Sequence, residues 1–169
     1  MVVADECKIQ REPNPFYRWS VKGKTPVIRV DRKKGDAVSF YGGLSLKTKR
    51  EIAYITSNHQ TGKETCHFLD EIRKRYEGKG TVLLVWDGAM HHQGDVKVWL
   101  RNNPGVVDLR KFPPYCPDLN PQEHVWKVLR KELSTIVHEV SYEQLIDRAC
   151  RILLTKTFDY DFGIPADLI

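Results

Sequence analysis

Hydrophobic and polar positions divide the chain into a first third with the pattern of β-strands and a remainder in which helices and strands alternate. In the first third, short runs rich in β-branched and aromatic residues are bounded by turn-forming residues, which predicts strands. The expected strands are residues 2–9, 17–21, 27–30, 37–46 and 51–57, with a turn at residues 22–26. After them, apolar residues recur at helical spacing from residue 68 to residue 76, and glycines follow at 78 and 80. This pattern predicts a helix that begins at Thr61 or Gly62.

The segment 81–86 is almost continuously apolar and stops abruptly at Asp87-Gly88. Its length and β-branched content predict a central strand that is covered on both faces by helices. We expect a short helix at 94–102, a strand at 106–110, a loop with three prolines at 112–119, and helices at 121–133 and 141–155. Strands followed by alternating helices and strands predict an α/β fold with a mixed sheet. A length of 169 residues predicts a single domain, residues 1–169.

Composition is that of a folded protein, with 41% hydrophobic and 29% charged residues. No stretch approaches the ~18 consecutive apolar residues of a membrane span, and the N-terminus lacks the features of a signal peptide. We therefore expect a cytoplasmic protein without a membrane partner. The four cysteines form no C-x-x-C pair, which favours reduced thiols. The four tryptophans are expected in the core or at its edge rather than as platforms for bases: Trp19, Trp86, Trp99 and Trp126.

Positive charge is concentrated at the start of the chain. Residues 1–50 hold 12 basic and 5 acidic residues, whereas residues 51–169 hold 15 basic and 17 acidic residues. Such an asymmetry fits a polyanionic partner such as DNA, although a solvated basic hairpin would give the same pattern. The candidate DNA contacts in this region are Lys22, Lys24, Lys33 and Lys34.

Asp87 is the first candidate for chemistry, because it follows the apolar strand directly. Ligand-binding groups of α/β sheets gather at the carboxyl ends of strands, so an acid here is well placed to bind a metal ion. The alternative is a turn aspartate, since Asp-Gly is itself a strong turn signal.

The second candidate is Glu123, within the segment Asn120-Pro121-Gln122-Glu123 that follows the proline-rich loop. Asn120 is a natural N-cap, and Glu123, three residues later, would complete a capping box, which is a purely structural explanation. A first-turn glutamate can equally reach a metal ion held at a neighbouring strand end. Basic residues follow on the face of Glu123, where they could contact phosphates or form an i,i+4 pair with it: Lys127, Arg130 and Lys131.

Together these motifs resemble the catalytic domain of the DDE transposases, specifically the mariner-related bacterial insertion-sequence group. Three blocks match in order: Asp5-Glu6 on the first strand, Asp87-Gly88-Ala89-Met90-His91-His92 after the apolar strand, and Asn120-Pro121-Gln122-Glu123 with Trp126. The 35 residues between Asp87 and Glu123 are close to the spacing usual in this group. Gly88 stands where the group more commonly has Asn.

The resemblance implies a ribonuclease-H-like fold in which Asp5, Asp87 and Glu123 are the catalytic residues and hold two Mg²⁺ or Mn²⁺ ions. It implies that water first cuts the transposon end, and that the resulting 3′-OH then attacks target DNA. His92 matches a histidine of the group and is a candidate DNA contact. We leave Glu6 out of the metal site, because adjacent side chains of a strand point to opposite faces. A zinc site at His91 and His124 lacks a fourth ligand at regular spacing.

The resemblance also implies partners: transposon ends, target DNA and a second copy in an active homodimer. Full-length relatives carry an N-terminal helix-turn-helix region, and with Asp5 so early in this sequence we expect that region to be absent or supplied by a separate polypeptide. Because the group is bacterial, the resemblance also implies that the protein acts on DNA in the nucleoid of a prokaryote. The alternatives are a stand-alone ribonuclease-H-like nuclease or resolvase, and an inactive remnant that only binds DNA. The role of residues 158–169 is left open.

Overall fold

The computed structural model describes residues 1–10, 19–24, 37–57, 60–87, 94–113, 120–134 and 141–159. Within these residues the chain forms five strands and four helices. The strands are β1 (Val2–Gln10), β2 (Ala37–Ser45), β3 (Arg50–Ser57), β4 (Val82–Trp86) and β5 (Val107–Lys111). The helices are α1 (Gly62–Tyr76), α2 (Gly94–Asn102), α3 (Gln122–Ser134) and α4 (Tyr142–Thr155).

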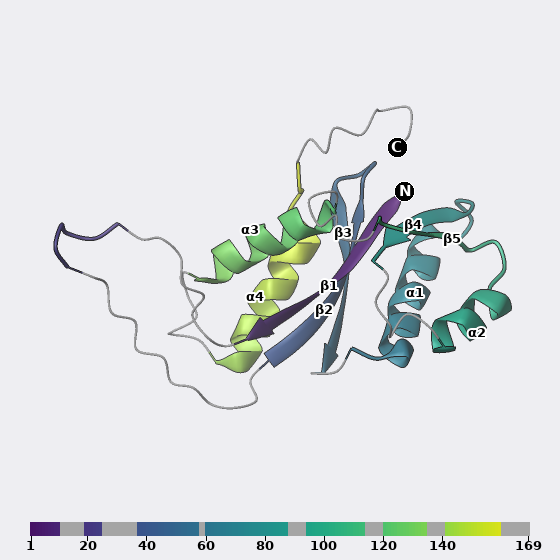
Figure 1. Cartoon of the computed structure of the whole chain (residues 1–169), viewed down its shortest axis with the longest axis horizontal. Helices are drawn as coiled ribbons and strands as arrows, with labels where there is room; N and C mark the ends of the chain where they lie inside the picture. The colour runs from purple at the N-terminus through teal and green to yellow at the C-terminus, as the bar shows by residue number, and fades with distance from the viewer. Residues whose placement is uncertain are drawn as a thin grey trace.

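The five strands form one sheet in the order β3-β2-β1-β4-β5. Strands β1, β2 and β3 pair in antiparallel fashion, whereas β4 lies parallel to both β1 and β5. The expected α/β fold with a mixed sheet is therefore confirmed. Helices α1 and α2 lie on one side of the sheet, and α3 and α4 lie on the other (Figure 1).

The alternation of side chains along β1 divides the core between the two sides of the sheet. Val3, Cys7 and Ile9 belong to the cluster that contains the apolar faces of α3 and α4. Val2 and Ala4 belong to the second cluster, which contains the apolar residues of α1 and α2. Asp5, one position after Ala4, therefore lies on the α3 side, and Glu6 lies on the α1 side.

Two sequence expectations fail in this region. The run 81–86 is not covered equally on both faces: Val82, Leu84 and Trp86 are buried, but the two residues between them are only half-buried. The cause is that α3 packs on β1 and β2 and α4 packs on β3, so neither helix covers β4 as α1 and α2 do. Trp19, expected in the core or at its edge, is fully exposed.

The segment 19–24 confirms only the turn that we expected there. Lys22 and Gly23 form a turn, and residues 19–21 are not in a strand. The remainder of the two strands expected at 17–21 and 27–30 lies outside the described residues, as do Lys33, Lys34, His91 and His92.

The segment after α4 returns to the sheet as far as it is described. Thr157 forms a β-bridge with Arg50, and the Phe158 N–H donates to the carbonyl of Lys49 at 2.8 Å. The Phe158 side chain is buried in the core on the α3 and α4 side. This residue therefore packs as part of the domain, while 160–169 lie outside the described residues.

Candidate active site

Three carboxylates meet where β1 passes the end of β4. The parallel register pairs Val2 with Leu84 and Val3 with Val85. Two residues further along each strand, Asp5 and Asp87 come alongside each other. One carboxylate oxygen from each of Asp5, Glu6 and Asp87 lies within 4.8 Å of the others. We call these three residues the acid cluster.

Glu6 is thus a member of the cluster, although we had left it out because of strand alternation. Its side chain does start on the opposite face from that of Asp5. However, β4 ends at Trp86, so no strand residue of β4 separates the two faces beside Glu6. The longer glutamate side chain places a carboxylate oxygen within 4.8 Å of those of Asp5 and Asp87.

Asp5 is held in one orientation by three donors. Its Oδ2 accepts hydrogen bonds from Asn120 Nδ2 at 3.1 Å and from Trp126 Nε1 at 3.2 Å. Its Oδ1 accepts from the backbone N–H of Glu6 at 2.9 Å. The start of α3 therefore binds directly to the first acid of the cluster, and the sequence motif around Glu123 serves Asp5 as well.

The first turn of α3 differs from the capping box that the sequence suggested. The Asn120 Oδ1 accepts from the N–H of Gln122 at 3.0 Å, while the N–H of Glu123 donates to the backbone carbonyl of Asn120 at 3.1 Å. Among the described residues, no hydrogen bond joins the Glu123 carboxylate to the Asn120 N–H, and no ion pair joins it to Lys127. Both structural explanations for Glu123 are therefore absent from this part of the chain.

Burial raises the pKa of Asp5 to about 7, and the carboxylates of Glu6, Glu123 and Asp87 add to the rise. The N–H of Glu6 acts in the opposite direction on that pKa. Glu123 lies outside the tight cluster of three, yet it is close enough for its charge to act on Asp5. Negative charge from four acids converges here, and a bound cation would relieve their mutual repulsion.

The donor set fits a hard divalent ion. Mg²⁺ and Mn²⁺ prefer oxygen ligands and are commonly held by a few carboxylates, with the remaining positions left for water and phosphate oxygens. The acid cluster offers three carboxylates within the reach of one ion, and Glu123 offers a fourth nearby.

The buried acids predict that the metal-free protein loses stability as the pH rises. Burial also raises the pKa of Glu51 on β3, to about 8. Glu51 and Asp5 thus keep their protons in the folded chain at a pH where the unfolded chain, with ordinary pKa values of 4.5 and 3.8, has lost them. The folded state binds more protons between about pH 4 and pH 8, so the free energy of unfolding falls across this window.

Urea unfolding at pH 5 and pH 8 without divalent ions measures this effect. Glu51→Gln, which has no proton to lose, should reduce the difference between the two pH values. An equal difference in the variant and the unaltered chain would contradict the assignment to Glu51.

The candidate DNA contacts differ in their placement. Lys127 and Lys131 are exposed on α3, and Lys22 and Lys24 are exposed in the segment 19–24. Arg130 is half-buried instead, and its Nη2 lies 3.1 Å from the Sγ of Cys7 on β1. It therefore lies against the sheet, two residues along β1 from Asp5.

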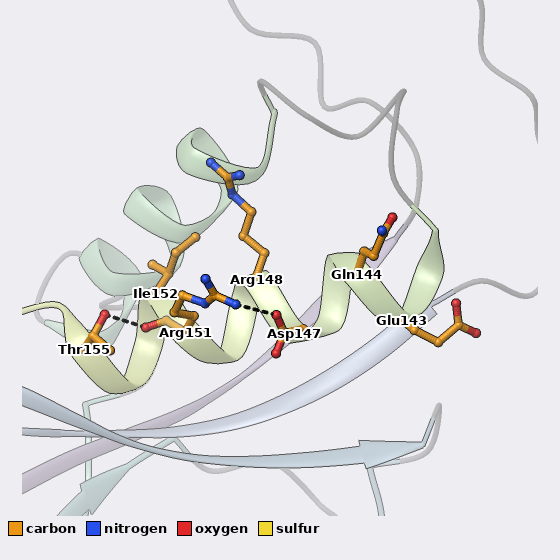
Figure 2. Close-up of a pocket in the computed structure, with 7 residues that line it drawn as sticks. All are labelled: Glu143, Gln144, Asp147, Arg148, Arg151, Ile152 and Thr155. Atoms are coloured by element: carbon orange, nitrogen blue, oxygen red, sulfur yellow. Dashed lines mark hydrogen bonds and ion pairs between the residues drawn. The ribbon is translucent and has the colours of Figure 1, made fainter.

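A separate hollow lies along the outer face of α4, and no member of the acid cluster lines it. Figure 2 shows the ion pair of Arg151 with Asp147, at 2.9 Å, and the Thr155 hydroxyl, which donates to the Arg151 carbonyl. Its lining residues are Glu143, Gln144, Asp147, Arg148, Arg151, Ile152 and Thr155. All of them belong to one helix, and we assign no function to this surface.

Sequence reasoning missed three residues around the acid cluster. From the sequence we expect only packing for Trp126, and we expect no role at the site for Gln122 or for Glu51 on β3. The signal for Trp126 was its position six residues after Asn120, which places Asn120 just before α3 and Trp126 in its second turn. Nothing local in the sequence identified Glu51, because its environment is created by residues far from it in the chain.

The strand order and the flanking helices define a ribonuclease-H-like fold. Solved structures with this fold include "Mos1 transposase paired-end complex with left transposon end", at 18% identity and a TM-score of 0.65. The match covers 95% of this chain and 49% of that chain, so the chain spans about half the length of that protein. "Crystal structure of the catalytic domain of Mos1 mariner transposase" matches at 14% identity and a TM-score of 0.57, over 95% of this chain and 72% of that one.

An integrase domain shares the fold as well. "Crystal structure of catalytic core domain of BIV integrase in crystal form I" matches at 14% identity and a TM-score of 0.51, over 70% of this chain and 76% of that one. No curated protein matches the sequence. Among the described helices, none has both the length and the apolar character needed to cross a membrane.

The family follows from the sequence itself. Residues 1–146 of the 169 match the model of the DDE superfamily endonucleases, and the chain belongs to that family. The expected resemblance to the DDE family is thereby confirmed, and the solved structures confirm the expected fold.

Proposed function

We propose that this chain is the catalytic domain of a transposase, which cleaves DNA and joins the cut end to target DNA in a metal-dependent reaction. The observation that carries the proposal is the convergence of Asp5, Glu6 and Asp87 within 4.8 Å, with the charge of Glu123 acting on the same site. Likeness to the Mos1 transposase in complex with a transposon end supports DNA as the substrate.

Asp5, Asp87 and Glu123 would hold the divalent ions, and Glu6 stands close enough to contribute. Bound there, two ions would activate the attacking oxygen and stabilise the leaving oxygen of an in-line displacement. The titles of two further Mos1 complexes name Mn and Mg, which supports these metals for the present chain. Asp5 must release its proton to serve as a ligand, so metal binding and proton release are coupled.

The protein supplies orientation. Asn120 and Trp126 both donate to Oδ2 of Asp5, and this holds the carboxylate in one orientation beside Asp87 and Glu6. Cleavage and joining are both phosphodiester displacements, so one set of acids can serve both steps.

We propose that recognition of the transposon ends requires a further module, in this chain or in a separate polypeptide. We also propose that the active complex is a homodimer and that it acts in a prokaryotic nucleoid.

A cleavage and joining assay tests this function. The chain is incubated with Mn²⁺ or Mg²⁺ and labelled duplex DNA that carries a transposon end, and the products are separated by size. Cut strands together with joined products are expected for a transposase. Cutting without joining would favour the nuclease or resolvase. Metal-independent DNA binding with no cutting, even when the chain is fused to a recognition domain, would identify a remnant.

Replacing both Lys127 and Lys131 with glutamine should weaken DNA binding in a salt-dependent way. Each lysine that neutralises a phosphate contributes about 0.9 to the slope of log affinity against log salt, so the double variant should lose up to about 1.8. Fluorescence anisotropy at several salt concentrations measures the slope. Lys97→Gln, an exposed lysine on α2 across the sheet, is the matched control. An unchanged slope in the double variant would remove α3 from the DNA interface.

A further inference from the structure

A buried polar pair connects β3 to the first turn of α3. Glu51 is 5% exposed and Gln122 is completely buried. The Gln122 Nε2 donates a hydrogen bond to Glu51 Oε1. The second oxygen of each group, Glu51 Oε2 and Gln122 Oε1, has no hydrogen-bond partner among the described residues. We call these two residues the Glu51–Gln122 pair.

A neutral Glu51 resolves the two unpaired oxygens together. Two carbonyl-type oxygens cannot bond to each other, and leaving them both buried and unpaired is costly. A protonated Glu51 carries an O–H, which is the kind of donor that the acceptor Gln122 Oε1 needs. Burial is the largest influence on the pKa of Glu51 and raises it to about 8. The hydrogen bonds from Gln122 and Gly43 act in the opposite direction but are the smaller effect. An acid–amide pair with two hydrogen bonds is therefore consistent with the surroundings at neutral pH.

The sheet makes room for this pair at Gly42, the residue of β2 that pairs with Asp5. A Cβ at position 42 would lie 2.3 Å from both Gln122 Nε2 and Glu51 Oε1, and 2.4 Å from Trp126 Cη2. Only glycine lets α3 approach the sheet this closely. The pair and the Trp126 ring therefore lie over the strand position directly beside Asp5.

We propose that Glu51 is a positioning residue, which fixes the first turn of α3 through Gln122 and so sets the reach of Glu123 toward Asp5. Gln122 is adjacent to Glu123, and Asn120, two residues earlier, bonds to both the Gln122 N–H and Asp5. A shift at Gln122 is therefore transmitted to the acids on both sides of the site. This inference rests on the proposed function, because it assigns Glu51 a role in metal binding.

Two substitutions at Glu51 separate position from charge. Glu51→Gln keeps the length of the side chain and supplies an N–H for Gln122 Oε1, so Mn²⁺ affinity should stay within about twofold of the unaltered chain. Glu51→Asp keeps the acid but shortens the side chain, which withdraws it from Gln122. Residues that orient metal ligands typically contribute about 10–100-fold to metal affinity, and a loss in this range is expected for Glu51→Asp. Electron paramagnetic resonance titration with Mn²⁺ alone measures the affinity.

A double-mutant cycle with Glu123→Ala tests whether Glu51 acts through Glu123. In that background, Glu51→Asp should weaken Mn²⁺ binding no further. Leu153→Ala, which empties a buried site on α4, controls for general destabilisation and should leave Mn²⁺ affinity unchanged in the folded protein.

The outcomes separate this inference from the proposed function. Mn²⁺ binding that is unaffected by Glu51→Asp, or affected equally with and without Glu123, would overturn the positioning role alone. Failure of the unaltered chain to bind Mn²⁺ would contradict the proposed function, and the positioning role with it.

Discussion

Replacing Asp87 with alanine is expected to abolish metal-dependent cleavage of DNA, with a loss of at least about a thousandfold in rate. Asp87 is exposed at the end of β4 and shares the cluster with Asp5 and Glu6. Its removal takes away one of the carboxylates that would hold the divalent ions. These ions would neutralise the negative charge that develops during displacement at the phosphodiester. Stabilisation of this kind amounts to several kcal/mol, and each 1.4 kcal/mol or so is a factor of ten in rate.

Cleavage of labelled duplex DNA in Mn²⁺ measures the loss, and Glu123→Ala should show a loss of the same order. Asp108→Ala is the matched control, because Asp108 is an exposed acid on the neighbouring strand β5, paired with Arg110 at 3.0 Å. Glu6→Gln tests whether the third member of the cluster is needed: a loss like that of Asp87→Ala would make its carboxylate part of the metal site. Undiminished cleavage by Asp87→Ala would place the chemistry elsewhere.

Removing the Trp126 side chain is expected to have the largest effect on stability. Trp126 is completely buried in the core between α3 and the sheet. Truncating such a residue to alanine costs about 3–5 kcal/mol, because a large cavity remains. Since a domain is stabilised by only about 5–15 kcal/mol, Trp126→Ala should shift urea unfolding strongly or prevent folding.

Trp126→Phe separates packing from hydrogen bonding. Most of the buried ring remains, so unfolding should shift much less than in Trp126→Ala. The donor to Asp5 Oδ2 is lost, however, and a 10–100-fold fall in Mn²⁺ affinity is expected.

Trp99→Phe offers a closely matched control. Trp99 is also buried, and its Nε1 donates to Asp70 Oδ1 at 3.1 Å on the other side of the sheet. The Trp99→Phe variant should lose about as much stability as Trp126→Phe, but its Mn²⁺ affinity should not change. Equal metal affinities in the two phenylalanine variants would mean that Trp126 serves packing only.

The sequence predicted most of the described elements and two of the candidate acids, because the signals for both are local. The helix at α2 was predicted with the bounds that it has. One residue at one or both ends separates the prediction from the structure for β2, β3, β4, β5, α3 and α4. Hydrophobic periodicity, caps and glycines act over a few residues, so they can be read directly from the chain. Asp87 after an apolar strand and Glu123 after Asn120-Pro121 were found in this way.

Only the tertiary structure decided which side chains meet. Glu6 joined Asp5 and Asp87 because β4 ends beside it, a consequence of the register between two strands about 80 residues apart. Trp126 and Asn120 reached Asp5 across more than 110 residues of sequence. Glu51 became a buried acid opposite Gln122 because Gly42 lets α3 approach the sheet, and Trp19 became exposed because its segment lies outside the sheet. Local patterns specify strands and helices, whereas burial, hydrogen bonding and charge at the acid cluster depend on contacts that exist only once those elements have packed.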